Sequence, residues 1–400
     1  MQKVVIIGGG HAGIQCAMKL REYGFSGQIQ VLSEEAYFPY HRPPLSKKFL
    51  TGEVSEEELY IFNPEVIEKN QIEMIFNTHV LEVDHLQKIV KTSDNAYAFD
   101  QLVVASGAAP RRLDLPELQG VENLCYCRNI VDIHKIANHL DQIEHVAIIG
   151  GGYIGLELAA TLKKLGKKVG LIEKAPRILQ RVASEQTAAY IKQEHHVQGV
   201  SIFENTGVNH YQVEDHQIRA LELDNGQTLP CDLLIVGIGV IPNTAFLSDD
   251  FEKVNGSLLV NECCQTNQKD VYAIGDCTIF YLDQDLTKLE SIQNANEQAD
   301  IAARAITGQS VQYAPKPWFW SDQYELKIQI AGLARGYDQV LSRLSADKAS
   351  FWYLNGSKLV AVDSVNDVRS FMIGKKFVGS NVADLSKITD PDADLKSNFV

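Results

Sequence analysis

Two stretches of the chain decide its fold, VVIIGGGHAG at residues 4–13 and VAIIGGGYIG at residues 146–155. Each begins with four apolar residues, as in a parallel strand covered on both faces, and continues directly into the spacing G-x-G-x-x-G. A helical pattern follows each glycine motif, and a second apolar strand then leads to an acidic residue, Glu34 in the first copy and Glu173 in the second. This order of elements predicts a dinucleotide-binding unit, and its repetition predicts two of them.

The glycine motif binds a dinucleotide because each glycine meets a different steric demand. The first allows a tight turn, the second lets the backbone approach a pyrophosphate at the helix N-terminus, and the third lets the helix pack on the strand. The acid at the end of the second strand accepts a hydrogen bond from a ribose hydroxyl. A single motif is often an ordinary tight turn, but two complete copies indicate two dinucleotides. A flavin and a nicotinamide cofactor are the economical interpretation.

Further strand-to-glycine junctions indicate where one unit is interrupted by the other. The stretches LVVASG at residues 102–107 and LLIVGIG at residues 233–239 mark the two crossings. Another apolar strand ends in Gly275-Asp276, where Asp276 is either a helix N-cap or a carboxylate that accepts a hydrogen bond from a flavin's ribityl chain. The character of the sequence changes near residue 312, after which residues 326–330, 351–354 and 359–362 predict strands and residues 366–378 a helix.

We therefore predict an α/β protein with two Rossmann-like dinucleotide-binding domains and a C-terminal α+β domain. The expected domain boundaries are 1–110 and 239–312 for the two parts of the interrupted unit, 111–238 for the inserted unit and 313–400 for the C-terminal domain. A family resemblance, for which the residues follow, implies that the interrupted unit is the FAD-binding domain and the inserted unit the NAD-binding domain.

The composition excludes several classes of partner. The 37 Lys and Arg residues against 51 Asp and Glu residues give a net charge of −14, which repels nucleic-acid phosphates and anionic lipid. No apolar run approaches the ~20 residues of a membrane-spanning helix, and the N-terminus does not resemble a signal peptide. The seven cysteines are odd in number and scattered, and zinc-ligand spacings are absent. We expect a cytoplasmic protein that binds no nucleic acid, membrane or metal.

Four features together resemble a known family: the N-terminal unit, RPPLSK at residues 42–47, the Gly275-Asp276 strand and PWFWSDQY at residues 317–324. They are similar to those of bacterial FAD-dependent NADH:ferredoxin reductases of the putidaredoxin reductase type, which serve Rieske dioxygenases and haem monooxygenases. The resemblance covers residues 1–375 and implies a fold like that of glutathione reductase. It also implies a reaction in which NADH gives a hydride to FAD, and the flavin passes single electrons to a small iron–sulfur protein.

The resemblance implies a set of site residues, position by position. Glu34 would bind the adenosine ribose of FAD, Val80 would meet the adenine, and Asp276 would hold the ribityl chain. The residues expected to contact FAD are Gly8, Gly10, Ala12, Gly13, Glu34, Arg42, Lys47, Val80, Arg128, Asp276, Ile292 and Trp320. Those expected to bind NADH are Gly150, Gly152, Ile154, Gly155 and Glu173. Lys47, Glu157 and Trp320 would act in the reaction itself: Lys47 near the isoalloxazine ring, Glu157 as its ion-pair partner, and Trp320 where nicotinamide arrives.

Each of these three residues also has a plainer interpretation. Glu157 lies in the first turn of a predicted helix, where the helix dipole alone stabilises a carboxylate by ~0.3–1 kcal/mol. Lys47 stands beside Lys48 and is equally consistent with a solvated loop lysine, while Trp320 is consistent with a core residue.

Glu173 favours NADH, because a carboxylate accepts from the ribose 2′-hydroxyl and repels a 2′-phosphate. The nearby Lys174 and Arg177 weaken this preference, since an NADPH site uses a cation there.

Cysteine placement narrows the function within this fold. Residues 35–60 contain no cysteine and the chain has no C-x-x-C, which argues against disulfide reductases, NADH peroxidases and coenzyme A-disulfide reductases. The enzyme alternatives are a rubredoxin reductase or an NADH oxidase, and the alternative outside enzymes is a redox-controlled signalling flavoprotein like apoptosis-inducing factor.

For the oligomeric state, a monomer and a homodimer are both consistent with the sequence. Because ferredoxins are acidic, we expect a local basic docking patch drawn from Arg42, Lys47, Lys48, Arg304 and Lys316.

Overall fold

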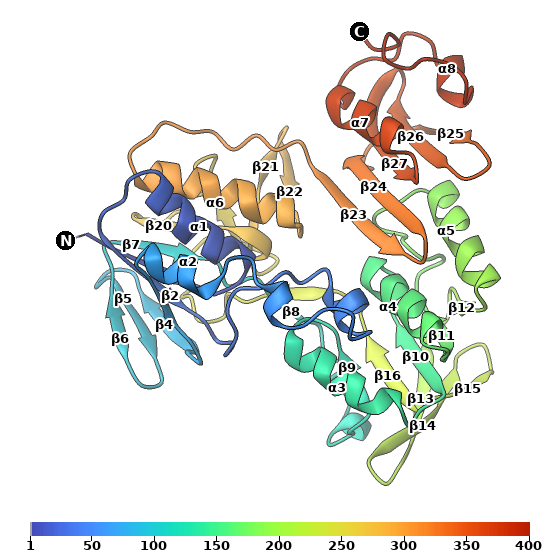
Figure 1. Ribbon diagram of the computed structural model, residues 1–400, viewed down its shortest axis with the longest axis horizontal. Coiled ribbons are helices and arrows are strands. Elements are labelled where there is room, and N and C mark those ends of the chain that lie inside the picture. The colour runs from blue at the N-terminus through green and yellow to red at the C-terminus, as the bar shows by residue number, and fades with distance from the viewer. Residues whose placement is uncertain (1) are drawn as a thin grey trace. The chain divides into compact units, whose positions relative to one another are not determined.

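A computed structural model describes residues 2–400, and the chain forms two compact units (Figure 1). The first comprises Met1–Arg42, Glu56–Ala109 and Val240–Pro315, and the second comprises Pro43–Ser55, Pro110–Gly239 and Lys316–Val400. The segment Pro43–Ser55, which the predicted boundaries assign to the FAD-binding domain, thus packs within the second unit. The division into three domains stays a prediction.

The first unit is built on a parallel sheet of five strands in the order β20-β7-β1-β2-β3. The strands are β1 (Lys3–Ile7), β2 (Gln28–Leu32), β3 (Ile72–Ile75), β7 (Gln101–Val104) and β20 (Val271–Ala273). Helix α1 (His11–Glu22) starts directly after the first glycine motif and packs against α6 (Ile292–Ile306). The four apolar residues that open the chain's first motif are buried in β1, as a parallel strand with two covered faces requires.

Smaller elements complete the first unit. Strands β4 (Val80–Asp84), β5 (Ile89–Thr92) and β6 (Ala96–Ala98) form an antiparallel sheet. A second small sheet joins β18 (Lys253–Val254), β19 (Ser257–Val260), β21 (Thr278–Leu282) and β22 (Asp285–Thr287). Strand β8 (Ala108–Pro110) pairs with β17 (Val240–Pro242), and α2 (Pro64–Lys69) precedes β3. Short helical turns occur at Glu57–Leu59 and Gly275–Cys277.

The second unit repeats the parallel sheet, in the order β12-β11-β10-β16-β9. Its strands are β9 (Leu124–Tyr126), β10 (His145–Ile149), β11 (Lys168–Ile172), β12 (Ser201–Phe203) and β16 (Leu233–Val236). In both sheets the strand before the glycine motif is central and pairs with the strand that follows its helix. The helices here are α3 (Ile130–Leu140), α4 (Tyr153–Lys164) and α5 (Glu185–Val197), with short turns at Leu45–Phe49 and Pro116–Leu118. An antiparallel sheet of β13 (Val208–Glu214), β14 (Gln217–Leu223) and β15 (Thr228–Pro230) is added.

The C-terminal part of the second unit is an antiparallel sheet in the order β23-β24-β27-β26-β25 with two helices. Its elements are β23 (Trp318–Gln323), β24 (Leu326–Gly332), β25 (Gln339–Leu344), β26 (Ala349–Asn355), β27 (Lys358–Val365), α7 (Val368–Phe377) and α8 (Ser386–Thr389). The expected strands and helix of this region are confirmed, as is the fold class. Strands β23 and β25 were not predicted, because neither stretch has a complete alternation of apolar and polar residues.

The last twenty residues pack against this C-terminal sheet, and their side chains Val382, Ile388 and Leu395 are buried in its core. The buried guanidinium of Arg343 donates to four backbone carbonyls of the tail, those of Lys387, Ile388, Pro391 and Ala393, at 2.8–3.4 Å. The ring of Phe399 stacks on Phe377 and Trp352, with centroids 4.7 and 6.1 Å apart. A buried arginine and an aromatic stack therefore anchor a segment whose sequence carries no recognisable motif.

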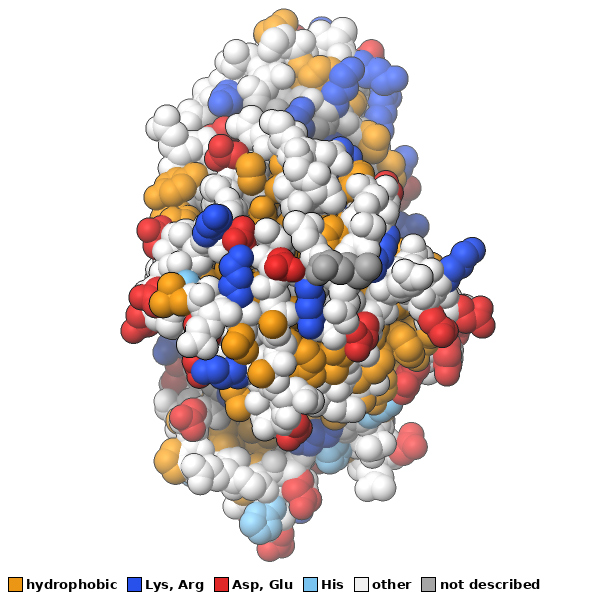
Figure 2. Space-filling model, turned by 90° about the vertical axis from the view of Figure 1, so that its left-hand side faces the viewer, with side chains coloured by type: hydrophobic (Ala, Val, Ile, Leu, Met, Phe, Trp, Pro, Cys, Tyr) orange, Lys and Arg blue, Asp and Glu red, His pale blue; other side chains and the backbone are white. Residues whose placement is uncertain are grey.

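Acidic and basic side chains are interspersed over the face seen in Figure 2, with hydrophobic side chains between them. Within residues 2–400, no helix has the length and apolarity needed to cross a membrane.

Candidate functional site

The first glycine motif is shaped for a phosphate group. Gly8 has φ = +113°, and a Cβ there would lie 2.2 Å from the carbonyl oxygen of Ala105. A Cβ on Gly13 would lie 2.0 Å from the carbonyl oxygen of Gly8, so helix and strand meet as closely as backbone allows. Gly10, the N-cap of α1, is different, because a Cβ there would meet nothing within 4 Å. The open side of the motif thus lies at the glycine where a pyrophosphate is expected.

The second motif repeats this arrangement. Gly150 has φ = +115°, and a Cβ on Gly155 would lie 2.1 Å from the carbonyl oxygen of Gly150. Around Gly152, the N-cap of α4, a Cβ would again meet nothing within 4 Å. Ile154, expected at the NADH pyrophosphate, is 46% exposed. The residues of both motifs therefore fit the dinucleotides that the sequence predicts.

The turn that carries Asp276 lies against the first motif. Gly275 has φ = +78°, and a Cβ there would lie 3.1 Å from the Cβ of Ala12. Its N–H donates to the side-chain oxygen of Gln298 on α6 at 2.7 Å. The structure thus brings together the motif and Asp276, which is half-buried.

Glu34 and Val80 are placed by the end of β2 and the start of β4. Glu34 is exposed, and one of its carboxylate oxygens lies 2.9 Å from Nδ1 of His79. Val80 is buried at the first position of β4. Ile292 opens α6 after the N-cap Ser291. These residues share the first unit with the glycine motif, and their contacts to FAD stay predictions.

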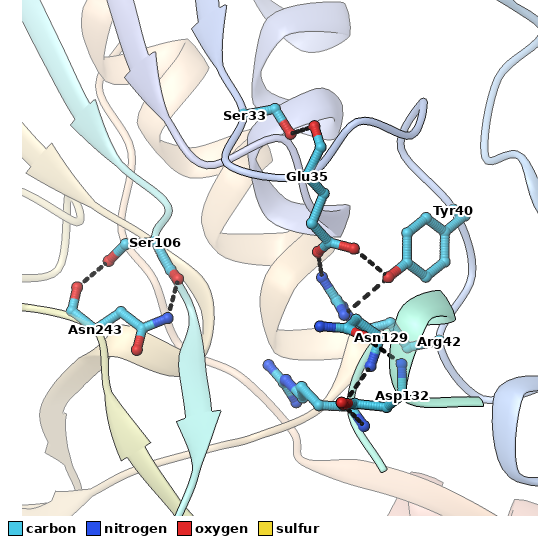
Figure 3. A network of polar contacts seen from close by, with 9 residues as sticks. Ser33, Glu35, Tyr40, Arg42, Ser106, Asn129, Asp132 and Asn243 are labelled. Atoms are coloured by element: carbon cyan, nitrogen blue, oxygen red, sulfur yellow. Dashed lines mark hydrogen bonds and ion pairs between the residues drawn. The ribbon is translucent and has the colours of Figure 1, made fainter. Parts of the chain in front are cut away.

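The neighbouring residue Glu35 was not predicted and is the centre of a polar network (Figure 3). Its carboxylate accepts from Arg42 Nη2 at 2.6 Å and from the hydroxyl of Tyr40 at 2.5 Å. Arg42, expected at the flavin, is therefore held by an acid of the same unit.

Two histidines adjoin this region, with the rings of His11 and His41 5.4 Å apart. Burial and the neighbouring His41 lower the pKa of His11 to about 4, so His11 is neutral near pH 7.

Glu173 organises the second glycine motif from the end of β11. One carboxylate oxygen accepts from the N–H of Gly151 and the other from the N–H of Ala175, both at 2.7 Å. The predicted ribose acid is therefore already fixed by backbone donors. Lys174 is exposed, and Arg177 donates to the carbonyls of Ile178 and Ala183 at 3.2 and 2.6 Å.

Lys47 and Glu157 form an ion pair within the second unit. Lys47 Nζ lies 2.5 Å from Glu157 Oε2, and the side chains are only 19% and 9% exposed. Ser46 donates to the same oxygen at 2.7 Å, and Ser321 of β23 donates to Oε1 at 2.8 Å. The hydroxyl of Thr161, one turn along α4, donates to the carbonyl of Ser46 at 2.8 Å and so holds the lysine segment on the helix. The pairing of Lys47 with Glu157 is thereby observed, and the solvated-loop interpretation of Lys47 is wrong.

Trp320 is half-buried in β23 and stacks on Trp318, with ring centroids 5.7 Å apart at 28°. Trp318 also meets Phe371, and Lys375 Nζ lies 4.2 Å from its ring centroid. Trp320 is therefore not a fully buried core residue, and Trp318 belongs to the same aromatic pair.

Arg128 precedes α3 in the second unit. Its backbone N–H donates to Asp132, whose carboxylate forms a capping box with Asn129 (Figure 3).

All seven cysteines are unpaired: Cys16, Cys125, Cys127, Cys231, Cys263, Cys264 and Cys277. Burial raises the pKa of the Cys127 thiol to about 12, and it raises those of Cys16 and Cys231 to about 12 as well. Such thiols stay protonated and are poor nucleophiles. Across residues 2–400, no group of three or more His, Cys, Asp or Glu side chains could hold a metal ion.

Sequence reasoning missed Ser46, Glu35, Ser321 and Gln323. Ser46 lies within RPPLSK, and Ser321 and Gln323 lie within PWFWSDQY, two motifs that the sequence analysis quoted. Ser46 and Ser321 each bond to Glu157, which is more than 100 residues away, and no local sequence pattern indicates such a pair.

Comparison with known proteins agrees with this geometry. Residues 2–299 match the family described as pyridine nucleotide-disulphide oxidoreductase, and residues 318–399 match the family described as reductase C-terminal. A ferredoxin–NAD(P)(+) reductase of Sphingomonas sp is 38% identical, with 99% of this chain and 97% of the relative covered. A rubredoxin–NAD(+) reductase of Pseudomonas putida is 33% identical, with 91% and 95% covered.

A solved structure, the covalent putidaredoxin reductase–putidaredoxin complex, superposes with a TM-score of 0.89 at 34% identity. The match covers 95% of this chain and 94% of that one. The two glycine motifs have the same geometry, and each adjoins its own parallel sheet. The relatives align over nearly the whole length of the chain. We conclude that the chain belongs to the pyridine nucleotide-disulphide oxidoreductase family.

Proposed function

We propose that this protein is an FAD-containing NADH:ferredoxin reductase of the cytoplasm, which passes electrons to a small iron–sulfur protein that feeds an oxygenase. One observation carries the proposal: the chain holds two dinucleotide-binding motifs, each open at its second glycine, together with seven unpaired cysteines. Because the pKa values of the Cys16, Cys127 and Cys231 thiols are raised to about 12, these thiols stay protonated, and we infer that the electrons leave for an external acceptor rather than for a disulfide of the chain. The relative from Sphingomonas and the putidaredoxin complex name such acceptors for those proteins.

The residues of the first unit would hold FAD. The backbone of Gly8, Gly10 and Gly13 fits its pyrophosphate at the N-terminus of α1, and Glu34, Val80 and Asp276 would bind the rest of the cofactor. When bound, FAD accepts a hydride from NADH and gives up electrons one at a time.

The residues of the second unit would hold NADH. Gly150, Gly152 and Gly155 fit its pyrophosphate, and Glu173, fixed by two backbone N–H groups, would accept from the ribose 2′-hydroxyl. A 2′-phosphate would meet this carboxylate at close range, so NADH is preferred over NADPH. Lys47 would hold positive charge during hydride transfer, fixed by Glu157, and Trp320 would cover the nicotinamide.

Ion pairs within the protein involve several of the basic residues that were expected to form a docking patch for an acidic partner. Of the five cations considered, Arg42, Lys47 and Arg304 each pair with an acid, at 2.6, 2.5 and 2.8 Å. Lys48 is exposed. These ion pairs reduce the positive charge that Arg42, Lys47 and Arg304 can offer an acidic partner, so we expect electrostatic steering by these three residues to be weak.

The decisive experiment follows electrons through the purified holoprotein. NADH should bleach the flavin within a single turnover, and a panel of ferredoxins and rubredoxins should then reoxidise it. Reduction of a ferredoxin supports the proposal, whereas reduction of rubredoxin alone supports the alternative that the Pseudomonas relative suggests. Oxygen consumption without any carrier identifies an oxidase. A reduced flavin that persists with every carrier and with oxygen identifies a redox-controlled signalling protein and ends the proposal.

A further inference from the structure

The polar side chains of β23 form a hydrogen-bonded row that starts at Glu157. The hydroxyl of Ser321 lies 2.8 Å from Glu157 Oε1, and Gln323 Nε2 lies 3.1 Å from that hydroxyl. Gln323 Oε1 lies 2.9 Å from His195 Nε2 on α5, and His195 Nδ1 lies 3.3 Å from the hydroxyl of Tyr324. Ser321, Gln323 and His195 are at most 1% exposed. All of these residues belong to the second unit.

The row has only one consistent direction of donation. A carboxylate can only accept, so Ser321 must use its single proton on Glu157. Gln323 must then donate to Ser321, which turns its oxygen toward His195 and requires a proton on His195 Nε2. Burial lowers the pKa of His195, so the ring is neutral and its Nδ1 accepts from Tyr324. Every donor therefore points toward the carboxylate of Glu157.

Burying four polar side chains is costly unless each finds its partners, and here each does. Aligned hydrogen bonds also polarise one another, which strengthens the last bond in the row. Glu157 Oε1 is thereby occupied by the row, and Oε2 is left for Lys47 and Ser46. An amide does not pass a proton along a chain as a hydroxyl or imidazole does, so Gln323 makes the row suited to orienting a group rather than to conducting protons.

We propose that Ser321, Gln323 and His195 are positioning residues that orient the Glu157 carboxylate, and through it the ammonium group of Lys47, for reduction of the flavin. The inference rests on the proposed function and extends it, since it gives a role to the polar residues of the PWFWSDQY stretch. Alternation along β23 supports it: Ser321 and Gln323 face the row, while Asp322 between them is exposed.

The first test measures which ring nitrogen of His195 carries the proton, and it requires no enzymatic turnover. In holoprotein labelled with ¹⁵N-histidine, the His195 ring should carry its proton on Nε2 alone, with the signal assigned by its loss in His195→Gln. An Nδ1-protonated or doubly protonated ring near pH 7 would overturn the proposal, because Gln323 could not then donate toward Glu157.

The second test measures flavin reduction by NADH in stopped flow. Ser321→Ala should lower the limiting rate about ten-fold, as loss of a hydrogen bond to a charged group does, with the Kd for NADH unchanged. Ser321→Thr keeps the hydroxyl and should restore the rate. Asp322→Asn, the exposed neighbour, is the matched control and should leave the rate unchanged. Where Ser321→Ala yields no folded holoprotein, Gln323→Met serves in its place.

A double-mutant cycle shows whether Ser321 acts through Glu157. In a Glu157→Gln background, Ser321→Ala should slow the reaction no further. An undiminished effect in that background, or an unchanged rate for Ser321→Ala alone, contradicts the inference. Should NADH fail to reduce the wild-type flavin, the proposed function fails instead, and the histidine measurement still reports on the row.

Discussion

At the scale of single residues, the structure corrects the plainer interpretation of Glu157. Helix α4 begins at Tyr153 and has no acidic residue in its first turn, so Glu157 lies one turn further along, buried and surrounded by donors. A dipole at an exposed helix end contributes less than ~1 kcal/mol, which does not account for burying a charge. The hydrogen bonds from Lys47, Ser46 and Ser321 do account for it.

Replacing Lys47 by methionine should slow reduction of the flavin by NADH at least about ten-fold, because the side chain keeps its length and loses its charge. Stopped-flow absorbance at the flavin band measures the rate. Lys48→Met is the matched control, since Lys48 is the exposed neighbour in sequence, and its rate should equal that of the wild type. Equal rates for both variants would remove Lys47 from the reaction.

Glu173→Ala should reduce discrimination between NADH and NADPH by about ten-fold in kcat/KM. Two effects combine: the acceptor for the 2′-hydroxyl is lost, and the N–H groups of Gly151 and Ala175 lose their partner. Steady-state kinetics with both nucleotides measures the change, and Glu185→Ala, an exposed acid of α5, serves as the control. If the ratio of kcat/KM for NADH to that for NADPH does not change, a residue other than Glu173 determines the preference between the two cofactors.

At the scale of elements, the second and third glycines of each motif meet different requirements. The third glycine of each motif is needed by the protein itself, because helix and strand backbones touch there. A Cβ at the second glycine, by contrast, would meet no atom within 4 Å. We predict that this open space accommodates the ligand.

The pair Gly152→Ala and Gly155→Ala tests this separation within one motif. Gly152→Ala should leave the unfolding temperature unchanged and weaken NADH binding, because the new methyl group enters open space at the N-cap of α4. Gly155→Ala should destabilise the fold by about 1–3 kcal/mol, since its Cβ would lie 2.1 Å from a backbone oxygen. Calorimetry of unfolding and NAD⁺ titration measure the two effects; the reverse assignment would contradict the geometry.

A second buried network joins α5 to strands β26 and β27. Asp363 accepts from the hydroxyl of Thr187 at 2.9 Å and from that of Tyr353, which also meets the N–H of Ser184 at 2.8 Å. Burial raises the pKa of Asp363 to about 6. The carboxyl group therefore resists ionisation in the folded protein.

Asp363→Asn tests the consequence for stability. Between about pH 4 and pH 6 the folded protein holds the Asp363 proton while the unfolded chain releases it, so the wild type loses stability as pH rises. The free energy of unfolding of the wild type, minus that of Asp363→Asn, should thus fall by up to ~3 kcal/mol from pH 4 to pH 7. Thermal unfolding at several pH values measures this, with Asp322→Asn as the exposed control. A difference that stays constant or grows with pH would refute it.

At the scale of the whole molecule, duplication has produced two parallel sheets with one internal layout. In each, the strand before the glycine motif is central and the next strand pairs with it in the same register, Ile7 with Leu32 and Ile149 with Ile172. The carboxyl ends of these strands and the N-terminus of the following helix form one binding position per sheet. We therefore predict two separate cofactor positions, one in each compact unit.

Hydrogen exchange can test this assignment of cofactors. Removal of FAD should speed exchange at residues 8–13 and 275–277, and NAD⁺ should slow exchange at residues 150–155. Residues 349–355, in the core of the C-terminal sheet, should respond to neither ligand and serve as the control. Protection of residues 150–155 by FAD would reverse the assignment.

The sequence by itself determined the repeated elements, because glycine spacing, apolar strands and strand-end acids are all local patterns with local steric causes. Gly8, Gly13 and Asp276, and strands β24, β26 and β27 of the C-terminal sheet, could be predicted for this reason. The ion pair of Lys47 with Glu157 was indicated only through resemblance to a family, and the stacking of Trp318 on Trp320 was not predicted.

Tertiary structure alone decided which distant side chains meet. Two distant segments support Glu157, one with Ser46 and the other, β23, with Ser321 and Gln323. Glu35 holds Arg42. The C-terminal tail is fixed by the buried Arg343 rather than by any motif of its own. These pairings depend on long-range packing, which brings together donors and acceptors whose separation in sequence carries no pattern.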